Sequence, residues 1–272
     1  GGKGPVPEAR PNQQRYDLWV EGRYARFDTS LGDGDFYILH AGADVIAHQN
    51  LLLGFGVQFD WMESDGIGPS DGTVSGAGFM AGPYMTARLS DRLFFDGQFA
   101  FGGSTNEVSP FGTYEDEVNA DRVFASSALI GDFEFGAWTF RPEGRVSYFQ
   151  ESTDPYIDGL GVPIPSIDVE TGVAEFSPSV SYRVEFADTS VFEPYASVEG
   201  IWTFEQSTSA PLVLGSNDFL SEGVRGRVEG GFRYLTAGGV QFAASSFYDG
   251  FGSEDFSSWG AELRLSWSFD PQ

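Results

Sequence analysis

Two histidines and an aspartate are the residues of this chain whose types best suit chemistry. His40, Asp44 and His48 follow one another at four-residue intervals, and the chain has no other histidine. They share the polar face of a segment that alternates like a β-strand, a face that we predict to point inward. Four residues of a strand span about 13 Å. Side chains that far apart cannot share one metal ion or one proton. The spacing therefore predicts neither a catalytic triad nor a metal site.

Other patterns with known chemistry are weaker still. No H-E-x-x-H or phosphate-loop pattern occurs. Glu193 and Glu199 would suit acid–base catalysis, but they share one face with many arginines, which favours ion-pair networks. The acidic residues 114–118 (YEDEV) would offer oxygen ligands to a divalent cation, but their spacing is not that of a calcium loop. We predict a chain without catalytic, cofactor-binding or metal-binding residues.

The composition argues against several classes of protein. The 272 residues include 36 glycines and 16% aromatic residues, which favours many short strands and turns. The net charge is −25 and Lys3 is the only lysine, which argues against a nucleic-acid partner, because phosphate binding needs clustered basic residues. With no cysteine, no disulfide or zinc–thiolate site can form.

Apolar and polar residues alternate with a period of two from residue 16 onward, and no stretch has the 3.6-residue period of a helix. Residues 1–15 (GGKGPVPEARPNQQR) have neither period, so we predict a linker stub followed by one domain, residues 16–272. We predict twelve strands, at residues 16–27, 36–48, 51–63, 74–89, 93–104, 119–131, 138–150, 173–186, 191–204, 223–235, 240–248 and 258–269.

The connections between these strands alternate in length. HQNL, LSDRL, GDFEFG, ADTS and TAGG are tight turns; the longer connections are residues 28–35, 64–73, 105–119, 151–172, 205–222 and 249–257. Tight turns on one side and long loops on the other are typical of outer-membrane barrels. The sequence therefore predicts an all-β fold, a twelve-stranded antiparallel transmembrane outer-membrane β-barrel.

The two faces of each strand indicate what they meet. A soluble sandwich would show the same alternation, but here aromatic residues such as Trp61, Trp202 and Trp267 gather near the ends of the apolar faces, where a barrel meets lipid headgroups. The long connections hold twenty of the forty acidic residues and no Lys or Arg. The polar faces carry mixed charges, which suits a pore. We predict these pore-lining residues: Glu21, Arg23, Arg88, Arg141, Glu143, Arg145, Glu175, Arg183, Glu185, Glu193, Glu199, Arg225, Arg227, Glu229, Arg233, Glu262 and Arg264.

Small residues mark one part of the predicted inner wall. Gly54, Gly56, Gly76, Gly78, Gly82, Ala100 and Gly102 all fall on inward faces of the third to fifth strands. Such a wall would be recessed and could hold an extended or helical segment. Alternatively, the glycines permit strong strand curvature.

Several stretches together resemble a known family. They are YDLWVEGRYARF (16–27), HAGADVIAHQNLLLGFGVQFDW (40–61), AGPYMTARLSDRLFFDGQFAFG (81–102), the spacing of Pro142 and Tyr148, and a last strand that ends in Phe269. Their order is similar to that of the translocator barrel of autotransporters (type V secretion). The resemblance covers residues 16–269.

The resemblance implies a function and partners. It implies an outer-membrane domain of a Gram-negative bacterium that anchors in lipid and lipopolysaccharide and accommodates its own passenger polypeptide in the pore during secretion. It also implies a monomer that is not an enzyme, and a C-terminal signal for the outer-membrane assembly machinery. That signal would comprise Gly260, Leu263, Leu265, Trp267 and Phe269.

Two alternatives and one structural expectation remain. A stand-alone porin or channel for small polar solutes fits the same pattern, and an enzyme that uses His40 fits it less well. Prolines lack the N–H that a closed ladder needs. We therefore expect bulges or ladder gaps at Pro83, Pro142, Pro178 and Pro194.

Overall fold

Antiparallel strands make up almost all of the computed structural model, which describes residues 15–29, 32–67, 72–109, 112, 114–208 and 223–269. The linker predicted for residues 1–15 lies outside this part, apart from Arg15. The strands are β1 (Tyr16–Thr29), β2 (Gly32–His48), β3 (Leu51–Ile67), β4 (Gly72–Ser90), β5 (Leu93–Ser109), β6 (Asp116–Gly131), β7 (Phe133–Phe135), β8 (Trp138–Arg141), β9 (Glu143–Thr153), β10 (Tyr156–Ile157), β11 (Pro163–Ile164), β12 (Asp168–Phe176), β13 (Ser179–Tyr182), β14 (Val184–Glu185), β15 (Val191–Thr208), β16 (Gly223–Leu235), β17 (Val240–Phe251) and β18 (Phe256–Phe269).

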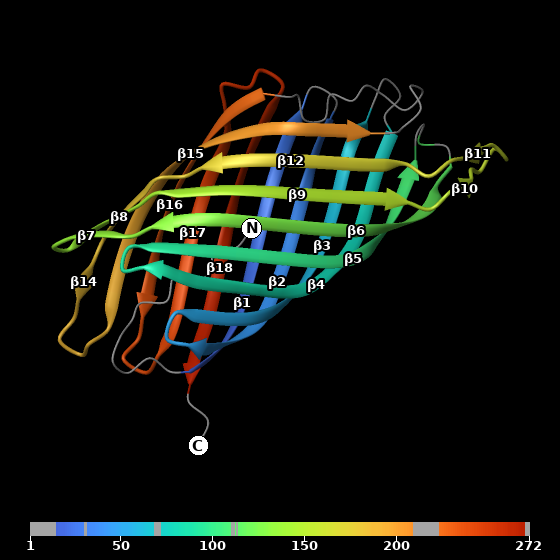
Figure 1. The fold of residues 1–272 in the computed structure, drawn as a ribbon. Helices are drawn as coiled ribbons and strands as arrows, with labels where there is room; N and C mark the ends of the chain where they lie inside the picture. Colours follow the sequence, from blue (N-terminus) through green and yellow to red (C-terminus); the bar gives the residue numbers. More distant parts are fainter. Residues whose placement is uncertain are drawn as a thin grey trace.

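All of these segments except β10 and β11, which form a separate two-stranded hairpin, make up twelve strands of one closed barrel (Figure 1). β6 continues as β7, β8 as β9, and β12 as β13 and β14, because the pairing register is unchanged across each interruption. The order then runs from β1 to β18, and β1 pairs with β18. The twelve predicted strands and the predicted fold are confirmed. Among the described residues, no helix is long and apolar enough to cross a membrane.

The four strand prolines interrupt hydrogen-bond ladders, as expected. The β4–β5 ladder skips Pro83, and Pro142 separates β8 from β9. The register places Pro178 directly opposite Pro142, so two residues that cannot donate face each other. Pro194 lies opposite the break between β13 and β14. The barrel therefore concentrates its ladder gaps where no N–H is available.

The strands extend further on the loop side than the alternation predicted. β2 begins at Gly32 rather than at residue 36, and β5 continues to Ser109 rather than to residue 104. Apolar alternation reports only the lipid-facing part of a strand, whereas ladder pairing continues beyond it. One predicted tight turn is shorter than expected: within residues 131–136, Gly131 ends β6 and Phe133–Phe135 form β7, and the β7–β8 hairpin turns at Gly136 with φ of 68°.

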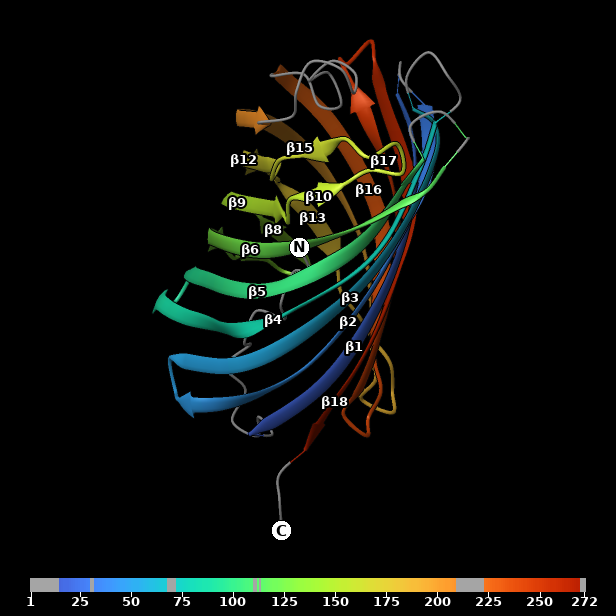
Figure 2. The same cartoon turned by 90° about the vertical axis from the view of Figure 1, so that its right-hand side faces the viewer.

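The strands form one curved wall (Figure 2). Its outward face carries large exposed apolar side chains, including Leu39, Phe55, Phe79, Phe101, Leu129, Val198, Leu263 and Leu265. Aromatic rings mark its two edges. Near the loop side, Tyr24, Tyr37 and Trp61 lie side by side in register on β1, β2 and β3. Near the turn side, Tyr16 stacks on Phe269 across the β1–β18 pair at 6.0 Å. Rings at both edges of an apolar band are typical of membrane barrels.

The inward glycines are places of close contact. A Cβ atom at Gly82 would meet the carbonyl oxygen of Phe99 and lie 2.7 Å from Cα of Ala100, and one at Gly102 would meet the carbonyl oxygen of Phe79. At these positions β4 and β5 approach each other too closely for any side chain. This contact supports the curvature explanation of the glycines.

Gly82 supplies a direct test of the close approach. We expect Gly82→Ala to lower the free energy of unfolding by about 1 to 3 kcal/mol, because rigid backbone cannot move away from the new Cβ. Urea titration of the refolded barrel in phospholipid vesicles would measure it. Gly144→Ala is the control, since a Cβ there meets nothing within 4 Å. Equal losses in the two variants would contradict the packing account.

Candidate functional site

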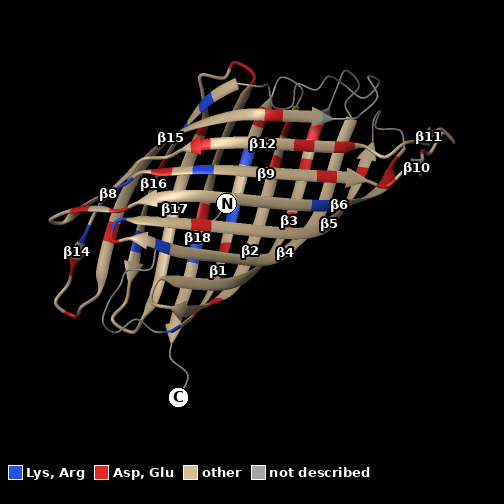
Figure 3. Cartoon of the chain, viewed as in Figure 1, with Lys and Arg blue, Asp and Glu red and all other residues tan. Residues whose placement is uncertain are grey.

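Charged residues occur on strands around the whole barrel (Figure 3). Several charged and polar side chains are buried in its interior, called the lumen below. Glu21 on β1 is the centre of one network and only 2% of its surface is exposed. Its carboxylate accepts from Arg264 Nη1 at 3.2 Å and lies 3.4 Å from His40 Nδ1. The other ring nitrogen, His40 Nε2, lies 2.7 Å from Gln58 Oε1. One carboxylate thus links β18, β1 and β2 across the closing pair.

The same network continues along the wall through Arg122. Gln58 donates to Asp60, and Asp60 Oδ2 accepts from Arg122 Nη1 at 2.7 Å. Arg122 Nε donates to Glu151 on β9 at 2.5 Å. Arg122 stands on β6 and Asp60 on β3, so this ion pair passes over β4 and β5.

A second bridge lies beside the first. Trp19 Nε1 donates to the Tyr84 hydroxyl at 2.6 Å, and that hydroxyl donates to Asp44 Oδ2 at 2.7 Å. The Trp19 ring covers Gly42 and the Tyr84 ring covers Gly54. Two rings therefore connect β1 with β4 across the two strands between them. The wall at Gly54 is filled, not recessed.

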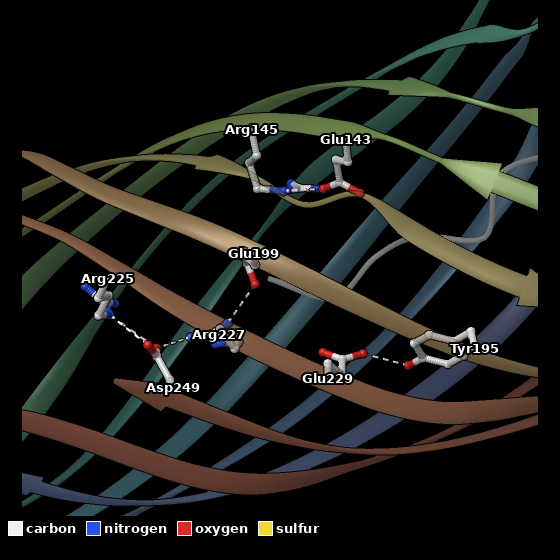
Figure 4. A network of polar contacts seen from close by, with 8 residues as sticks. All are labelled: Glu143, Arg145, Tyr195, Glu199, Arg225, Arg227, Glu229 and Asp249. Carbon is white, nitrogen blue, oxygen red and sulfur yellow. Dashed lines mark hydrogen bonds and ion pairs between the residues drawn. The ribbon is translucent and has the colours of Figure 1, made fainter. Parts of the chain in front are cut away.

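The opposite wall holds a denser cluster of ion pairs (Figure 4). Asp249 on β17 accepts from Arg225 at 3.0 Å and from Arg227 at 2.7 Å, and only 1% of its surface is exposed. Arg227 also reaches Glu199 on β15 at 3.5 Å. A buried carboxylate between two guanidinium groups has its charge fully compensated.

Arginines on both walls also lie against aromatic rings. The guanidinium carbons of Arg23 and Arg227 lie 4.7 Å and 5.1 Å from the centre of the Phe247 ring. Arg264 lies over Trp19 at 4.7 Å and Arg233 over Tyr195 at 4.6 Å. Cation–π contact keeps these long side chains flat on the wall.

The remaining residues that were predicted to line the pore lie beside charged or aromatic neighbours. Arg23 faces Glu262 in register across the β1–β18 pair, and Glu175 lies on the inward face of β12. Arg88 contacts the Phe94 ring near the turns. The other pairs are Glu143 with Arg145, Arg141 with Asp132, Arg183 with Glu185, Glu193 with Arg233, and Glu229 with Tyr195.

Sequence reasoning missed part of the lumen. Arg122, Asp60, Glu151 and Asp249 were not among the predicted pore residues, although all four are central to the networks. On β6 both faces mix small, apolar and polar residues, so alternation does not tell which side Arg122 takes. Glu151 and Asp249 fell into predicted loops because their strands are longer than predicted. Asp60 lies on β3 at an even number of residues from Gly54 and Gly56, which were assigned to the inward face, so the alternation alone could have identified it.

The histidine set of the sequence is dispersed, as the spacing predicted. His40 lies in the Glu21 network, but a β-bulge between Ile46 and His48 puts His48 at an exposed position beside the turn. The inward position predicted for His48 is therefore wrong. Among the described residues, no group of three or more His, Cys, Asp or Glu side chains is arranged to hold a metal ion.

The loop side of the barrel is acidic. Tyr114 and Tyr156 lie there beside Asp116 and Asp158, and desolvation together with these two carboxylates raises the pKa of both phenols. On the turn side, the hydroxyl and amide of Ser190 donate to Asp188 and lower its pKa.

Comparison with known proteins now identifies the family. The sequence model of the autotransporter β-domain matches residues 18–255. The chain is an autotransporter β-domain. Among curated proteins, no sequence matches it significantly. The solved structures similar to it include the β-domain of the Bordetella autotransporter BrkA, with 17% identity over 94% of this chain and all of that one and a TM-score of 0.76.

Two further autotransporter structures share the fold. The translocator domain of NalP from Neisseria meningitidis is 12% identical over 94% of this chain and 89% of its own, with a TM-score of 0.74. The transport unit of AIDA-I from Escherichia coli is 13% identical over 97% and 94%, with a TM-score of 0.68. The autotransporter β-domain described here is thus an outer-membrane translocator domain of a Gram-negative bacterium, the part of an autotransporter that is linked to a passenger domain.

Glu21 supplies the test of the lumen network. We expect Glu21→Ala to lower the free energy of unfolding by about 3 to 5 kcal/mol, because Arg264 loses its buried carboxylate. Glu185→Ala is the control, since 67% of the Glu185 side chain is exposed, and its loss should stay below about 1 kcal/mol. Urea titration in vesicles measures both. Similar losses would show that the buried Glu21 network is as solvated as the exposed Arg183–Glu185 pair.

Proposed function

We propose that the autotransporter β-domain moves its passenger past a lumen wall whose charges are already paired. The observation that carries this is the state of the inward arginines, which bond to carboxylates or lie flat on rings. A charged side chain that is already paired on the wall does not bind a passing chain tightly, yet it keeps the lumen hydrated. The pore-lining role of the seventeen predicted residues, and of Arg122, Asp60, Glu151 and Asp249, follows from this proposal.

We further propose the partners and the boundaries of the domain. The exposed apolar band with its aromatic edges would meet outer-membrane lipid and lipopolysaccharide. The barrel closes within one chain, which supports a monomer. Residues 1–15 would connect the passenger to the barrel. Since the histidines are dispersed and no metal cluster occurs among the described residues, we propose that the domain is not itself an enzyme.

The C-terminal strand would carry the signal for the outer-membrane assembly machinery. Leu263, Leu265 and Trp267 face outward and are about half exposed, and Phe269 stacks on Tyr16 at the turn-side edge. Gly260 lies against the Phe247 ring and the Tyr24 carbonyl, so no side chain fits there. Leu263, Leu265, Trp267 and Phe269 present one apolar face before the strand pairs with β1, and Gly260 lies on the opposite face.

We expect Phe269→Ser to reduce the amount of folded barrel in the outer membrane several-fold, because the apolar face of the signal is broken. Ser266→Ala, on the inward face of the same strand, is the control and should insert normally. Membrane fractionation and the mobility shift of unheated samples in SDS gels would measure both. Normal insertion of Phe269→Ser would exclude this residue from the signal.

A stand-alone channel is the second candidate function. One observation favours it: the fold also matches an outer-membrane channel from Pseudomonas putida F1, with 10% identity and a TM-score of 0.60. The autotransporter structures match better, at 0.68 to 0.76.

The proposed function predicts surface display. A passenger fused before residue 1 should become accessible to added protease in intact cells when the barrel is present. It should stay protected when β18 is deleted, because β1 then lacks its partner. Display without β18, or protection with the intact barrel in the membrane, would contradict the proposal.

A further inference from the structure

Arg122 makes an unusual connection within the lumen wall. Its guanidinium pairs with Glu151 on the neighbouring strand β9 and with Asp60 on β3, three strands away in the other direction. Three strand spacings measure about 14 Å along a sheet. Arg122 and Asp60 can meet over that distance only if both side chains lie along a wall that curves toward them. Arg122 is only 13% exposed and Asp60 only 4%, which agrees with this position.

The strand under this ion pair has no side chain at the crossing point. A Cβ atom at Gly78 on β4 would lie 2.9 Å from Cζ of Arg122 and 2.9 Å from Oδ2 of Asp60, and closer still to Nη1 of Arg122. Gly76 is covered in the same way by the side chain of Asn106, which donates to Glu151. The space over these glycines is therefore filled by one connected layer of polar side chains.

We propose that Arg122 is a transverse strut of the lumen, a side chain that ties together non-adjacent strands. Gly78 has no side chain and so leaves the space in which the Arg122 guanidinium group reaches Asp60. The strut ties β9 and β6 to β3, and so fixes the curvature of this wall from the inside. It also holds a guanidinium group flat on the wall, out of the space through which the proposed function sends the passenger. Only this last consequence rests on the proposed function.

A second ion pair provides a matched comparison. Arg145 and Glu143 also form a 2.8 Å pair in the lumen and are 12% and 7% exposed. Both stand on β9, two residues apart, so their pair spans no other strand. The two ion pairs are similar in chemistry and in burial, and they differ in that only the Arg122–Asp60 pair spans other strands.

The strut is tested by a double-mutant cycle between Gly78→Val and Arg122→Ala. Valine at 78 displaces the guanidinium, so each single variant breaks the same bridge. We expect each to lower the temperature at which the compact form in SDS gels is half lost, by about 5 °C or more. The double variant should melt no lower than the less stable single variant. Gly22→Val and Arg145→Ala form the control cycle, and their effects should add, because β1 and β9 lie far apart in the barrel and a Cβ at Gly22 meets nothing within 4 Å.

Conductance in planar bilayers distinguishes a displaced Arg122 guanidinium group (Gly78→Val) from a removed one (Arg122→Ala). Gly78→Val pushes the guanidinium into the lumen and should lower single-channel conductance, and Arg122→Ala in the same chain should restore it. Additive melting shifts for Gly78→Val and Arg122→Ala, or a conductance unchanged by Gly78→Val, would overturn the strut. Neither measurement needs a passenger. A strut confirmed in a barrel that fails to display its passenger would count against the proposed function alone.

Discussion

Every backbone N–H and C=O group within a bilayer must be bonded inside the protein, and this constraint governs the whole molecule. Hydrocarbon offers no partner for a free strand edge, so a sheet can cross lipid only when its last strand pairs with its first. Here β1 and β18 pair along their full common length, from Tyr16 with Phe269 to Thr29 with Phe256. Glu21 and Arg264 reinforce this pair from the lumen, and Tyr24 and Trp259 from the lipid side.

Closure forces the sheet to bend, and bending explains the interior. A curved wall brings inward side chains from non-adjacent strands toward one another, which a flat sheet would keep apart. Trp19 with Tyr84, and Arg122 with Asp60, use this proximity. Each connection passes over strands that carry glycine at the crossing point. The inward glycines are therefore best explained by what lies across them, while Gly82 and Gly102 serve the close approach of β4 and β5.

The sequence predicts the features that repeat along each strand, and it misses the contacts that folding creates between distant strands. Alternation predicted twelve strands and the face of Glu21, because lipid on one side and water on the other act on every residue of a strand. It ended β5 at residue 104 instead of Ser109, because above the lipid the polarity of the outward face changes while pairing continues. It could not anticipate the partner of Arg122, since no local pattern indicates which strand a curved wall brings near. The bulge before His48 is equally invisible to a period of two.

The central claim is that lipid meets the apolar face and water meets the charged one, and the tryptophans test it directly. Trp61, Trp138, Trp202, Trp259 and Trp267 are about half exposed on the outward face, whereas Trp19 bonds to Tyr84 inside the lumen. Variants that keep a single tryptophan should be refolded into vesicles of brominated phospholipid. Strong quenching of Trp267 fluorescence and none of Trp19 is the predicted result. Quenching of Trp19, or an unquenched Trp267, would contradict the account.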